Sequence, residues 1–285
     1  MIESWNRRNL AKHPCFNAGD RGRWGRVHMP IAPACNIQCN YCNRQYDCVN
    51  ESRPGVTRHL LEPAMAVEWL DQIMAKRQDI SVAGIAGPGD PLCNPDLTLK
   101  TLEAVHQRHP ELLLCVSTNG LNLTEHIDEL LEIRVTHLTV TVNAVDPAVA
   151  GEIYRWVRFG GHTYEGVEGA RLLLERQDEA LCRLREKNVI VKVNTVMLPG
   201  VNWEHIPAIA ERAAEWKADI MNCIPLIPVH DTPFETLKMP AAAEVERLRG
   251  IAGDFVPQMH HCNRCRADAV GQLKQPMPEC RPAIS

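Results

Sequence analysis

The chain has 285 residues, of which 45% are hydrophobic and 23% charged, proportions that are ordinary for a globular protein. The formal net charge of −4, from 31 Lys and Arg against 35 Asp and Glu, gives no reason to expect nucleic-acid binding. No apolar run reaches the roughly 18 residues that a membrane-spanning helix needs. The segment Met1 to Lys12 lacks the apolar core of a signal peptide. We therefore expect a cytoplasmic protein that binds neither nucleic acid nor a membrane.

Short apolar runs alternate with helical patterns along the middle of the chain. The candidate strands are Val27–Ile31, Ile80–Ala86, Leu112–Val116, His137–Val142, Val189–Val196 and Asp219–Ile224. The candidate helices are Pro63–Arg77, Asp96–His109, Thr124–Leu131, Val167–Glu186 and Trp203–Lys217. Pro63 suits a first helical turn and Thr124 an N-cap. This alternation predicts an α/β fold with a parallel sheet, either a partial barrel or a doubly wound sheet.

The two ends of the chain differ from this middle part. Residues 1–26 are polar and basic around Cys15, and the tail from Phe255 has several prolines and three cysteines. Such ends normally fray, and a shared metal cluster would fix them in place. We expect three parts: an N-terminal cluster-binding segment (1–26), a barrel (27–230) and a C-terminal segment with cluster ligands (231–285).

Twelve cysteines are an unusual number for this chain. Disulfides are rare in the reducing cytosol, so the close spacing of several cysteines favours metal ligation. Cys35, Cys39 and Cys42 form a C-x3-C-x2-C pattern directly after the first predicted strand. Three such thiolates can hold three irons of a [4Fe–4S] cluster and leave the fourth iron open. That open iron can chelate the amino and carboxylate groups of S-adenosylmethionine (SAM), whereas a zinc site typically has four protein ligands in two pairs.

This loop resembles the radical SAM superfamily, including the aromatic residue before the third cysteine, here Tyr41. The resemblance implies a partial (β/α)6 TIM-like barrel, with the irregular end segments capping its mouth. It also implies that SAM lies across the C-terminal ends of the strands, where barrels generally place their chemistry. Residues at those ends that suit SAM binding are Gly87, Gly89, Asp90, Ser117, Thr141, Asn143 and Asn194. Asp90 departs from the superfamily pattern, which has Glu at this position.

Further candidate ligands lie outside the loop. Cys262 and Cys265 form a C-x2-C pair, the commonest spacing of metal-binding thiols. Cys115 is expected at the end of the third strand, near the barrel mouth. His28 lies in the first strand, and a lone strand histidine is more often a core residue than a ligand. The remaining candidates are Cys15, in His13-Pro14-Cys15-Phe16, and Cys48, which precedes Glu51-Ser52-Arg53-Pro54-Gly55.

As a set, these motifs resemble the NifB family of nitrogenase cofactor maturases from about Lys12 to Cys265. The resemblance implies two further [4Fe–4S] clusters as substrates: K1 on His28, Cys48 and Cys115, and K2 on Cys15, Cys262 and Cys265. Cys93, Cys182, Cys223 and Cys280 would be structural or idle. The chain ends soon after the C-x2-C pair, which resembles the short form of the family without a product-binding domain.

The same resemblance implies a mechanism and partners. One SAM would methylate a K2 sulfide, and a radical from a second SAM would abstract hydrogen from that methyl group. The carbon would become a carbide as K1 and K2 fuse, with one added sulfur, into an eight-iron cofactor precursor. Glu51 would move protons or ligate iron, and Arg53 would assist or form a surface ion pair. The expected partners are a cluster-delivery protein, a carrier or scaffold for the product, and an electron donor such as ferredoxin.

Three other functions remain open from the residues alone. The first is another radical SAM enzyme, with auxiliary iron–sulfur clusters and an organic substrate. The second is a non-catalytic cluster carrier. The third is a structural zinc protein. Formation of 5′-deoxyadenosine separates the enzymes from a carrier, and metal analysis separates iron from zinc.

Overall fold

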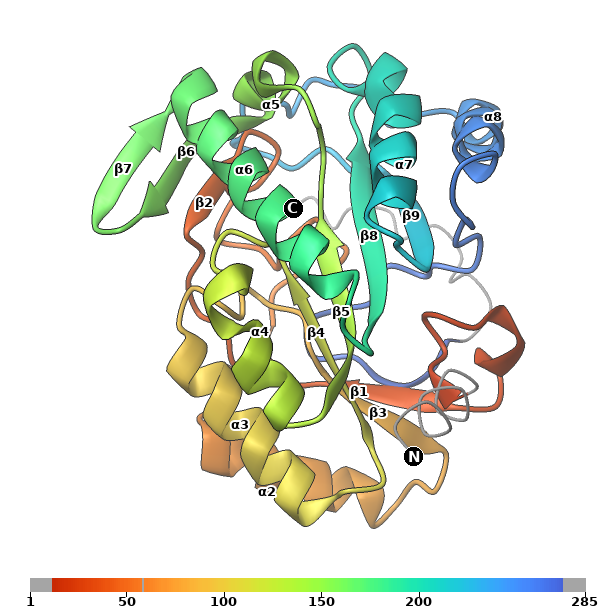
Figure 1. The fold of residues 1–285 in the computed structure, drawn as a ribbon. Helices are drawn as coiled ribbons and strands as arrows, with labels where there is room; N and C mark the ends of the chain where they lie inside the picture. The colour runs from red at the N-terminus through yellow and green to blue at the C-terminus, as the bar shows by residue number, and fades with distance from the viewer. Residues whose placement is uncertain (1–11, 58, 274–285) are drawn as a thin grey trace.

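The computed structural model describes residues 12–57 and 59–273. Its main sheet has seven strands in the order β10-β1-β3-β4-β5-β8-β9 (Figure 1). The strands are β1 Gly25–His28, β3 Ile80–Ile85, β4 Leu113–Thr118, β5 Val135–Thr141, β8 Ile190–Met197, β9 Ile220–Pro225 and β10 Val270–Gln272. All neighbours are parallel except β10, which pairs antiparallel with β1. The six parallel strands match the six predicted ones within a few residues at each end.

Each parallel strand is followed by at least one helix. The helices are α2 Pro63–Met74, α3 Pro95–Arg108, α4 Leu123–Glu132, α5 Pro147–Ile153, α6 Gly166–Leu184, α7 Ile206–Glu215 and α8 Ala242–Gly253, with short 3-10 helices η2 Ala18–Asp20 and η3 Trp203–His205. This arrangement confirms the predicted α/β partial barrel and rules out the doubly wound alternative. Pro63 does occupy the first turn of α2. The Thr124 N-cap was wrong, because α4 begins at Leu123 after an Asn122 N-cap, which places Thr124 inside the helix.

A second, three-stranded sheet was not expected from the sequence. It joins β2 Ile37–Cys39 to the hairpin of β6 Tyr154–Phe159 and β7 His162–Glu165. The hairpin projects beside α6 in Figure 1, and its turn uses Gly160 and Gly161 at positive φ. β2 and β7 have only three and four residues, and burial along the six residues of β6 does not alternate. The sequence pattern therefore did not reveal these strands, nor did it reveal α5, α8 and β10.

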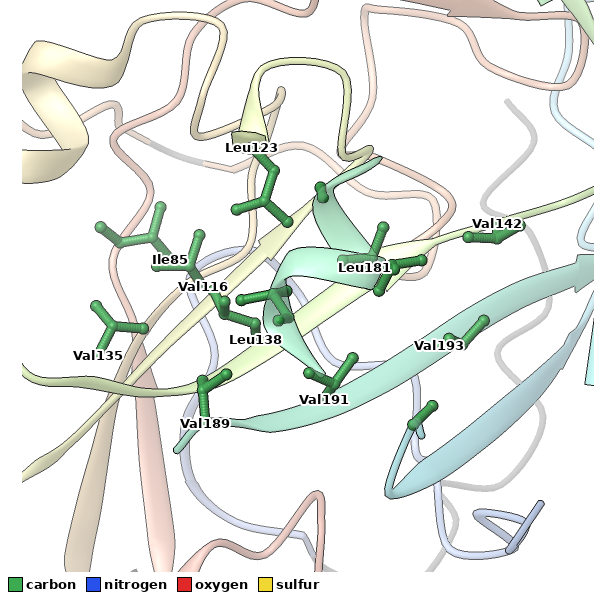
Figure 2. Close-up of a cluster of buried hydrophobic side chains, with 14 of the residues drawn as sticks. Ile85, Val116, Leu123, Val135, Leu138, Val142, Leu181, Val189, Val191 and Val193 are labelled. Atoms are coloured by element: carbon green, nitrogen blue, oxygen red, sulfur yellow. The ribbon is translucent and has the colours of Figure 1, made fainter. Parts of the chain in front are cut away.

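The main hydrophobic core lies between the sheet and the surrounding helices. Figure 2 shows Val116, Leu138 and Val193, from three neighbouring strands, gathered with Leu181 of α6. Since side chains alternate along a strand, the residues next to these point to the other face, into the barrel. Those neighbours include Cys115, Thr139 and Lys192. The barrel therefore has an apolar outer face and a polar interior.

The end segments pack against the barrel strands. The imidazole of His261 lies 3.0 Å from the carbonyl oxygen of Pro14, and His28 N–H donates to Ala269 O. The first contact joins the described parts of the two ends to each other, and the second places the C-terminal segment beside β1. The boundaries of the three expected parts stay a prediction. No helix in the described part of the chain is long and apolar enough to cross a membrane.

Candidate iron–sulfur and SAM site

The three-cysteine loop is fixed by the second sheet. Its central residues form β2, which pairs antiparallel with β6 so that Cys39 lies opposite Tyr154. Gln38 strengthens the loop, because its side-chain amide donates to the carbonyl oxygens of Cys39 and Cys42 at 3.1 and 2.6 Å. Asn40 N–H donates to Ile153 O at 2.8 Å. The hairpin inserted after β5 thus braces the backbone that carries the three thiols.

The three thiols open into one cavity, which we call the loop cavity. Its lining includes Cys35, Cys39, Cys42, Cys48, Glu51, Gly89, Asp90, Ser117, Asn119 and Thr141. Burial raises the pKa of the Cys35 thiol to about 12 and that of the Cys39 thiol well above its usual range. These thiols are therefore neutral unless a metal cation deprotonates them, as coordinating metals do. Three convergent thiols in a closed pocket suit a cluster with one iron left for another ligand.

Tyr41, the aromatic residue of the loop, is fully buried behind the cysteines. Its hydroxyl donates to Asn50 Oδ1 and accepts a hydrogen bond from Asn143 Nδ2, each at 2.6 Å. Asn143 also accepts the N–H of Val196 through Oδ1. Asn143, expected from the sequence to bind SAM, lies outside the described lining of the loop cavity and here orients Tyr41.

The expected SAM-binding segment after β3 packs directly on the approach to Cys35. Gly89 N–H donates to Ala32 O, and Asp90 N–H donates to Ala34 O. A Cβ on Gly89 would lie 2.0 Å from the oxygen of Ala34, so only glycine fits there. Gly87 has a φ of 133°, in the region that favours glycine. The glycines thus bring the segment against the loop.

The carboxylate of Asp90 links this segment to the end of β4. It accepts hydrogen bonds from Leu92 N–H at 2.9 Å, from Thr118 Oγ1 at 3.0 Å and from Asn119 N–H at 2.6 Å. Burial raises the pKa of Asp90, and the hydrogen bonds oppose that rise. Asp90 lines the loop cavity while holding two strand ends together.

A second cavity lies inside the barrel, and we call it the barrel cavity. Its lining includes His13, Cys15, His28, Glu51, Gly84, Cys115, Ser117, Lys192, Asn194, Asn222, Cys262, Arg264 and Cys265. It therefore brings together five of the six residues expected to hold substrate clusters. The sixth, Cys48, lines the loop cavity instead. Glu51 and Ser117 line both cavities, which are neighbours.

His28 and Cys115 face each other across Gly84. The register places His28 beside Gly84 and Gly84 beside Cys115, and a Cβ on Gly84 would lie 3.5 Å from His28 Cδ2 and 3.6 Å from Cys115 Cβ. The missing side chain leaves the space between the two open. Cys115 lies in the middle of β4, so the expectation that it ends the strand was wrong. Burial raises its pKa to about 12.

His28 has the properties of a neutral metal ligand. Burial lowers its pKa to about 3, so the ring carries no charge at neutral pH. Its Nδ1 lies 3.3 Å from the carbonyl oxygen of Arg266, which can only accept, so Nδ1 carries the proton. Nε2 is then left with a lone pair. Such a backbone partner commonly orients a histidine that binds metal.

The Cys15, Cys262 and Cys265 group is surrounded by cations. Burial raises the pKa of Cys15 to about 11, and the charge of Lys192 opposes this rise. Arg26 donates to the sulfur of Cys265 and to the carbonyl oxygen of Gly271. Such positive charges favour thiolates.

Arg264, inside the C-x2-C pair, ties this group to the rest of the site. It donates to Pro225 O at 2.6 Å and to Val49 O at 3.0 Å. The C-x2-C pair is thereby connected to β9 and to the segment of Cys48. Arg53 N–H donates to Cys265 O at 3.1 Å, which adds a second link between the two segments.

Four cysteines were expected to be structural or idle. Cys223 lies in the outer core and its thiol donates to Gln258 Oε1 at 3.4 Å. Cys182 is exposed on α6, and Cys93 is half-buried in the segment after Asp90. Cys280 lies outside the described residues. Their roles stay predictions.

Sequence reasoning missed several polar and charged residues of the barrel interior. Lys192, Asn222 and Arg264 line the barrel cavity, and Arg26 donates to the sulfur of Cys265. The available signal was alternation: Lys192 and Asn194 are separated by one apolar residue on β8, as expected for a strand with one polar face.

Sequence comparison places the chain in a known class. The sequence model of the radical SAM superfamily matches residues 29–213, and the chain belongs to this superfamily. This membership implies a [4Fe–4S] cluster and SAM as cofactors, and the three thiols of the loop cavity fit that cluster.

Two curated relatives are more specific. The chain is 48% identical over 263 residues to the FeMo cofactor biosynthesis protein NifB of Chlorobaculum tepidum, covering 92% of this chain and 62% of the relative. It is 44% identical over 286 residues to NifB of Klebsiella pneumoniae, covering 96% and 61%. The chain thus spans about three fifths of the length of these relatives.

Among solved structures, native anSMEcpe with bound AdoMet and Cp18Cys peptide is similar in fold. The TM-score is 0.53 at 14% identity, covering 81% of this chain and 59% of that chain. At this identity the likeness supports the fold alone.

Proposed function

We propose that this chain is a radical SAM maturase of nitrogenase cofactor biosynthesis, which builds an eight-iron precursor from two [4Fe–4S] substrate clusters. The observation that carries the proposal is the adjacency of two cavities. One is lined by the three loop cysteines, and the other by His28, Cys115 and the cysteines of both chain ends. The names of the curated relatives support the same pathway.

In this proposal, Cys35, Cys39 and Cys42 hold the resident cluster. When bound, that cluster supplies an electron and an open iron, at which SAM is cleaved to a 5′-deoxyadenosyl radical. The residues proposed to contact SAM are Gly87, Gly89, Asp90, Ser117, Thr141, Asn143 and Asn194. Of these, all but Gly87 and Asn143 line one or both cavities. Gly87 adjoins the others in the segment that packs on the loop.

Two sets of ligands are proposed for the substrate clusters. The first set, for K1, is His28, Cys48 and Cys115. His28 and Cys115 share the barrel cavity, and Cys48 lies in the neighbouring cavity, three residues before Glu51. Glu51 forms part of the wall between the two cavities. In this proposal the segment of Cys48 shifts past this wall toward Cys115, and that shift completes the set.

The second set, for K2, is Cys15, Cys262 and Cys265, which all line the barrel cavity. In the proposed reaction, a K2 sulfide accepts a methyl group from SAM. The carbon then loses hydrogen and becomes the central carbide of the fused product. A single cavity that contains the second set together with His28 and Cys115 of the first suits this fusion, because the two substrates must meet.

Glu51 and Arg53 are the proposed proton-transfer or iron-binding groups. Glu51 accepts hydrogen bonds from Thr141 Oγ1 at 2.9 Å and Asn194 Nδ2 at 3.0 Å. Burial raises its pKa, which brings a carboxyl group closer to the range where it exchanges protons at neutral pH. Its place in the lining of both cavities supports a role between SAM and the substrates.

The proposed partners are a cluster-delivery protein, an electron donor such as ferredoxin, and a carrier or scaffold protein that receives the product. A cytoplasmic location, where such proteins work, is part of the same proposal.

The test is anaerobic incubation of the cluster-loaded chain with SAM and a reductant. We expect 5′-deoxyadenosine, a methylated sulfur and an eight-iron product that activates cofactor-free nitrogenase. Formation of 5′-deoxyadenosine without an eight-iron product would favour the alternative radical SAM enzyme with an organic substrate. Absence of 5′-deoxyadenosine from a sample with an intact loop cluster would exclude both enzymes.

A further inference from the structure

Lys192 enters the barrel cavity from the middle of β8. It pairs in register with Thr139 of β5, which pairs with Ser117 of β4. Its side chain lines the cavity with Cys15 and Cys115, and the residue is only 7% exposed. The Lys192 side chain therefore lies inside the barrel, on a strand that is paired with a neighbour on each side.

The rows of inward-facing residues place Lys192 between two groups. Lys192, Thr139 and Ser117 form one row across the sheet. The row of His28, Gly84 and Cys115 lies on one side of it, because Cys115 is two residues before Ser117 on β4. On the other side is the row of Thr141 and Asn194, whose side chains donate to Glu51. Lys192 thus lies between the K1 ligands His28 and Cys115 and the Glu51 wall that the barrel cavity shares with the loop cavity.

The Lys192 ammonium has no carboxylate partner among residues 12–57 and 59–273, where its recorded contact is the ring of Phe16, 4.8 Å from Nζ to the centroid. Glu51 is the acidic residue in the described cavity lining. The charge of Lys192 acts to lower the pKa of Glu51, but the two side chains form no direct ion pair. The two arginines nearby differ, because Arg26 and Arg264 donate to backbone carbonyl oxygens.

A buried cation without a directly paired anion destabilises a fold, because it loses more by leaving water than distant charges return. Its presence indicates that an anion enters this cavity. The surrounding thiols supply such an anion when they bind iron: a [4Fe–4S] core with three thiolates carries net negative charge. The set of Cys15, Cys262 and Cys265 meets this condition, whereas the other set has two thiolates and a neutral His28, so the negative charge lies mainly with the cluster on Cys15, Cys262 and Cys265.

We propose that Lys192 is a substrate-binding residue that neutralises the iron–sulfur cluster on Cys15, Cys262 and Cys265 and positions it next to His28 and Cys115 in the barrel cavity. Its three N–H donors bond sulfide or thiolate sulfur of that cluster. The inference rests on the proposed function, because the two clusters are the proposed substrates.

The test compares Lys192→Met, which removes the charge at similar length, with Lys192→Arg, which keeps it. Each full-length protein is reconstituted anaerobically with iron and sulfide, and iron and acid-labile sulfide are counted. We expect about twelve irons in the wild type and in Lys192→Arg, and about four fewer in Lys192→Met. The matched control is Lys238→Met, an exposed position, with wild-type iron content.

A second readout separates charge from structure. Without the cation, the reduction potential of the remaining substrate cluster, from EPR-monitored titration, should become more negative, and Lys192→Arg should restore it. Wild-type iron content and potential in Lys192→Met would overturn the inference. So would a Lys192→Arg protein, folded by circular dichroism, that fails like Lys192→Met. Only about four irons in the wild type would instead refute the proposed function itself.

Discussion

Glu51 accepts a hydrogen bond from Asn194 Nδ2 at 3.0 Å, in the wall where the loop cavity meets the barrel cavity. The same carboxylate accepts from Thr141 Oγ1 at 2.9 Å, so both of its oxygens are oriented by strand residues. These two hydrogen bonds fix the rotamer of Glu51, and in this rotamer the carboxylate faces both cavities. It is the described residue best placed to pass protons between them.

The first prediction concerns Glu51→Gln. Glutamine keeps the shape and the fold but cannot take up a proton, so SAM cleavage should continue while its coupling to the substrate clusters fails. We expect near wild-type 5′-deoxyadenosine and about 10²-fold less eight-iron product, the usual scale for loss of a general acid or base. Quantifying both products in one reaction measures the ratio. The exposed Glu186→Gln is the control, and an unchanged ratio in Glu51→Gln would contradict this role.

The second prediction concerns Gly89→Ala. The added Cβ would lie 2.0 Å from the oxygen of Ala34, so the backbone before Cys35 must move. We expect a loss of about 1–3 kcal/mol in unfolding free energy, as in other overpacked sites, and a lower iron content of the loop cluster. Denaturant unfolding and iron analysis measure the two effects. Gly22→Ala is the matched control, because nothing lies within 4 Å of its added Cβ; equal effects in both variants would argue against the clash.

Much of the site could be predicted from sequence because its ligands are close along the chain. The spacing of Cys35, Cys39 and Cys42 identifies the loop, and the C-x2-C of Cys262 and Cys265 identifies a second group. The parallel strands were also predicted, since they are rich in Val, Ile and Leu and alternate with helical patterns along the chain.

The rest depends on contacts between distant segments. The pairing of Cys39 with Tyr154 joins a loop to a hairpin whose short strands carry weak periodicity. The alternation on β8 indicates that Lys192 lies on a polar face, but only the folded barrel shows that it shares a cavity with Cys115 and Cys15. The location of Cys48 beside the loop, rather than beside His28, follows from turns such as Ser52 N–H to Cys48 O, which leave no pattern in the sequence.

The third prediction concerns the pH dependence of stability. Burial, together with the charge of Lys192, lowers the pKa of His137 to about 3 in the folded protein, against about 6.5 in the unfolded chain. As pH falls below 6.5, the unfolded chain binds a proton that the folded protein does not, so stability decreases. Between pH 7 and pH 5 this one residue accounts for about 2 kcal/mol.

His137→Phe tests this assignment, because a phenyl ring fits beside His13 and Phe16, whose ring centroids lie 4.5 and 4.8 Å away. Denaturant unfolding of the metal-free protein at both pH values should show a stability loss smaller by about 2 kcal/mol than in the wild type. The buried rings of His13 and His28 act in the same direction, so some loss remains. Identical losses in the two proteins would show that His137 is protonated in the fold.

The fourth prediction separates the two ligand sets by iron counting. Cys15→Ala and Cys265→Ala should each lose about four irons, because both thiols line the barrel cavity. Cys48→Ala should also lose about four irons if its segment moves to complete the set of His28 and Cys115. Cys182→Ala, exposed on α6, is the control.

The loop cluster gives the second measurement in these variants. SAM-dependent 5′-deoxyadenosine formation should persist in Cys15→Ala and Cys265→Ala, because neither thiol lines the loop cavity. The Cys48→Ala variant tests whether the Cys48 thiol binds a substrate cluster or belongs to the loop cavity, where it lies beside the loop cysteines in this structure. Persistent SAM cleavage in Cys48→Ala assigns its thiol to a substrate cluster, whereas loss of cleavage together with the iron assigns it to the loop cavity and removes it from the set of His28 and Cys115.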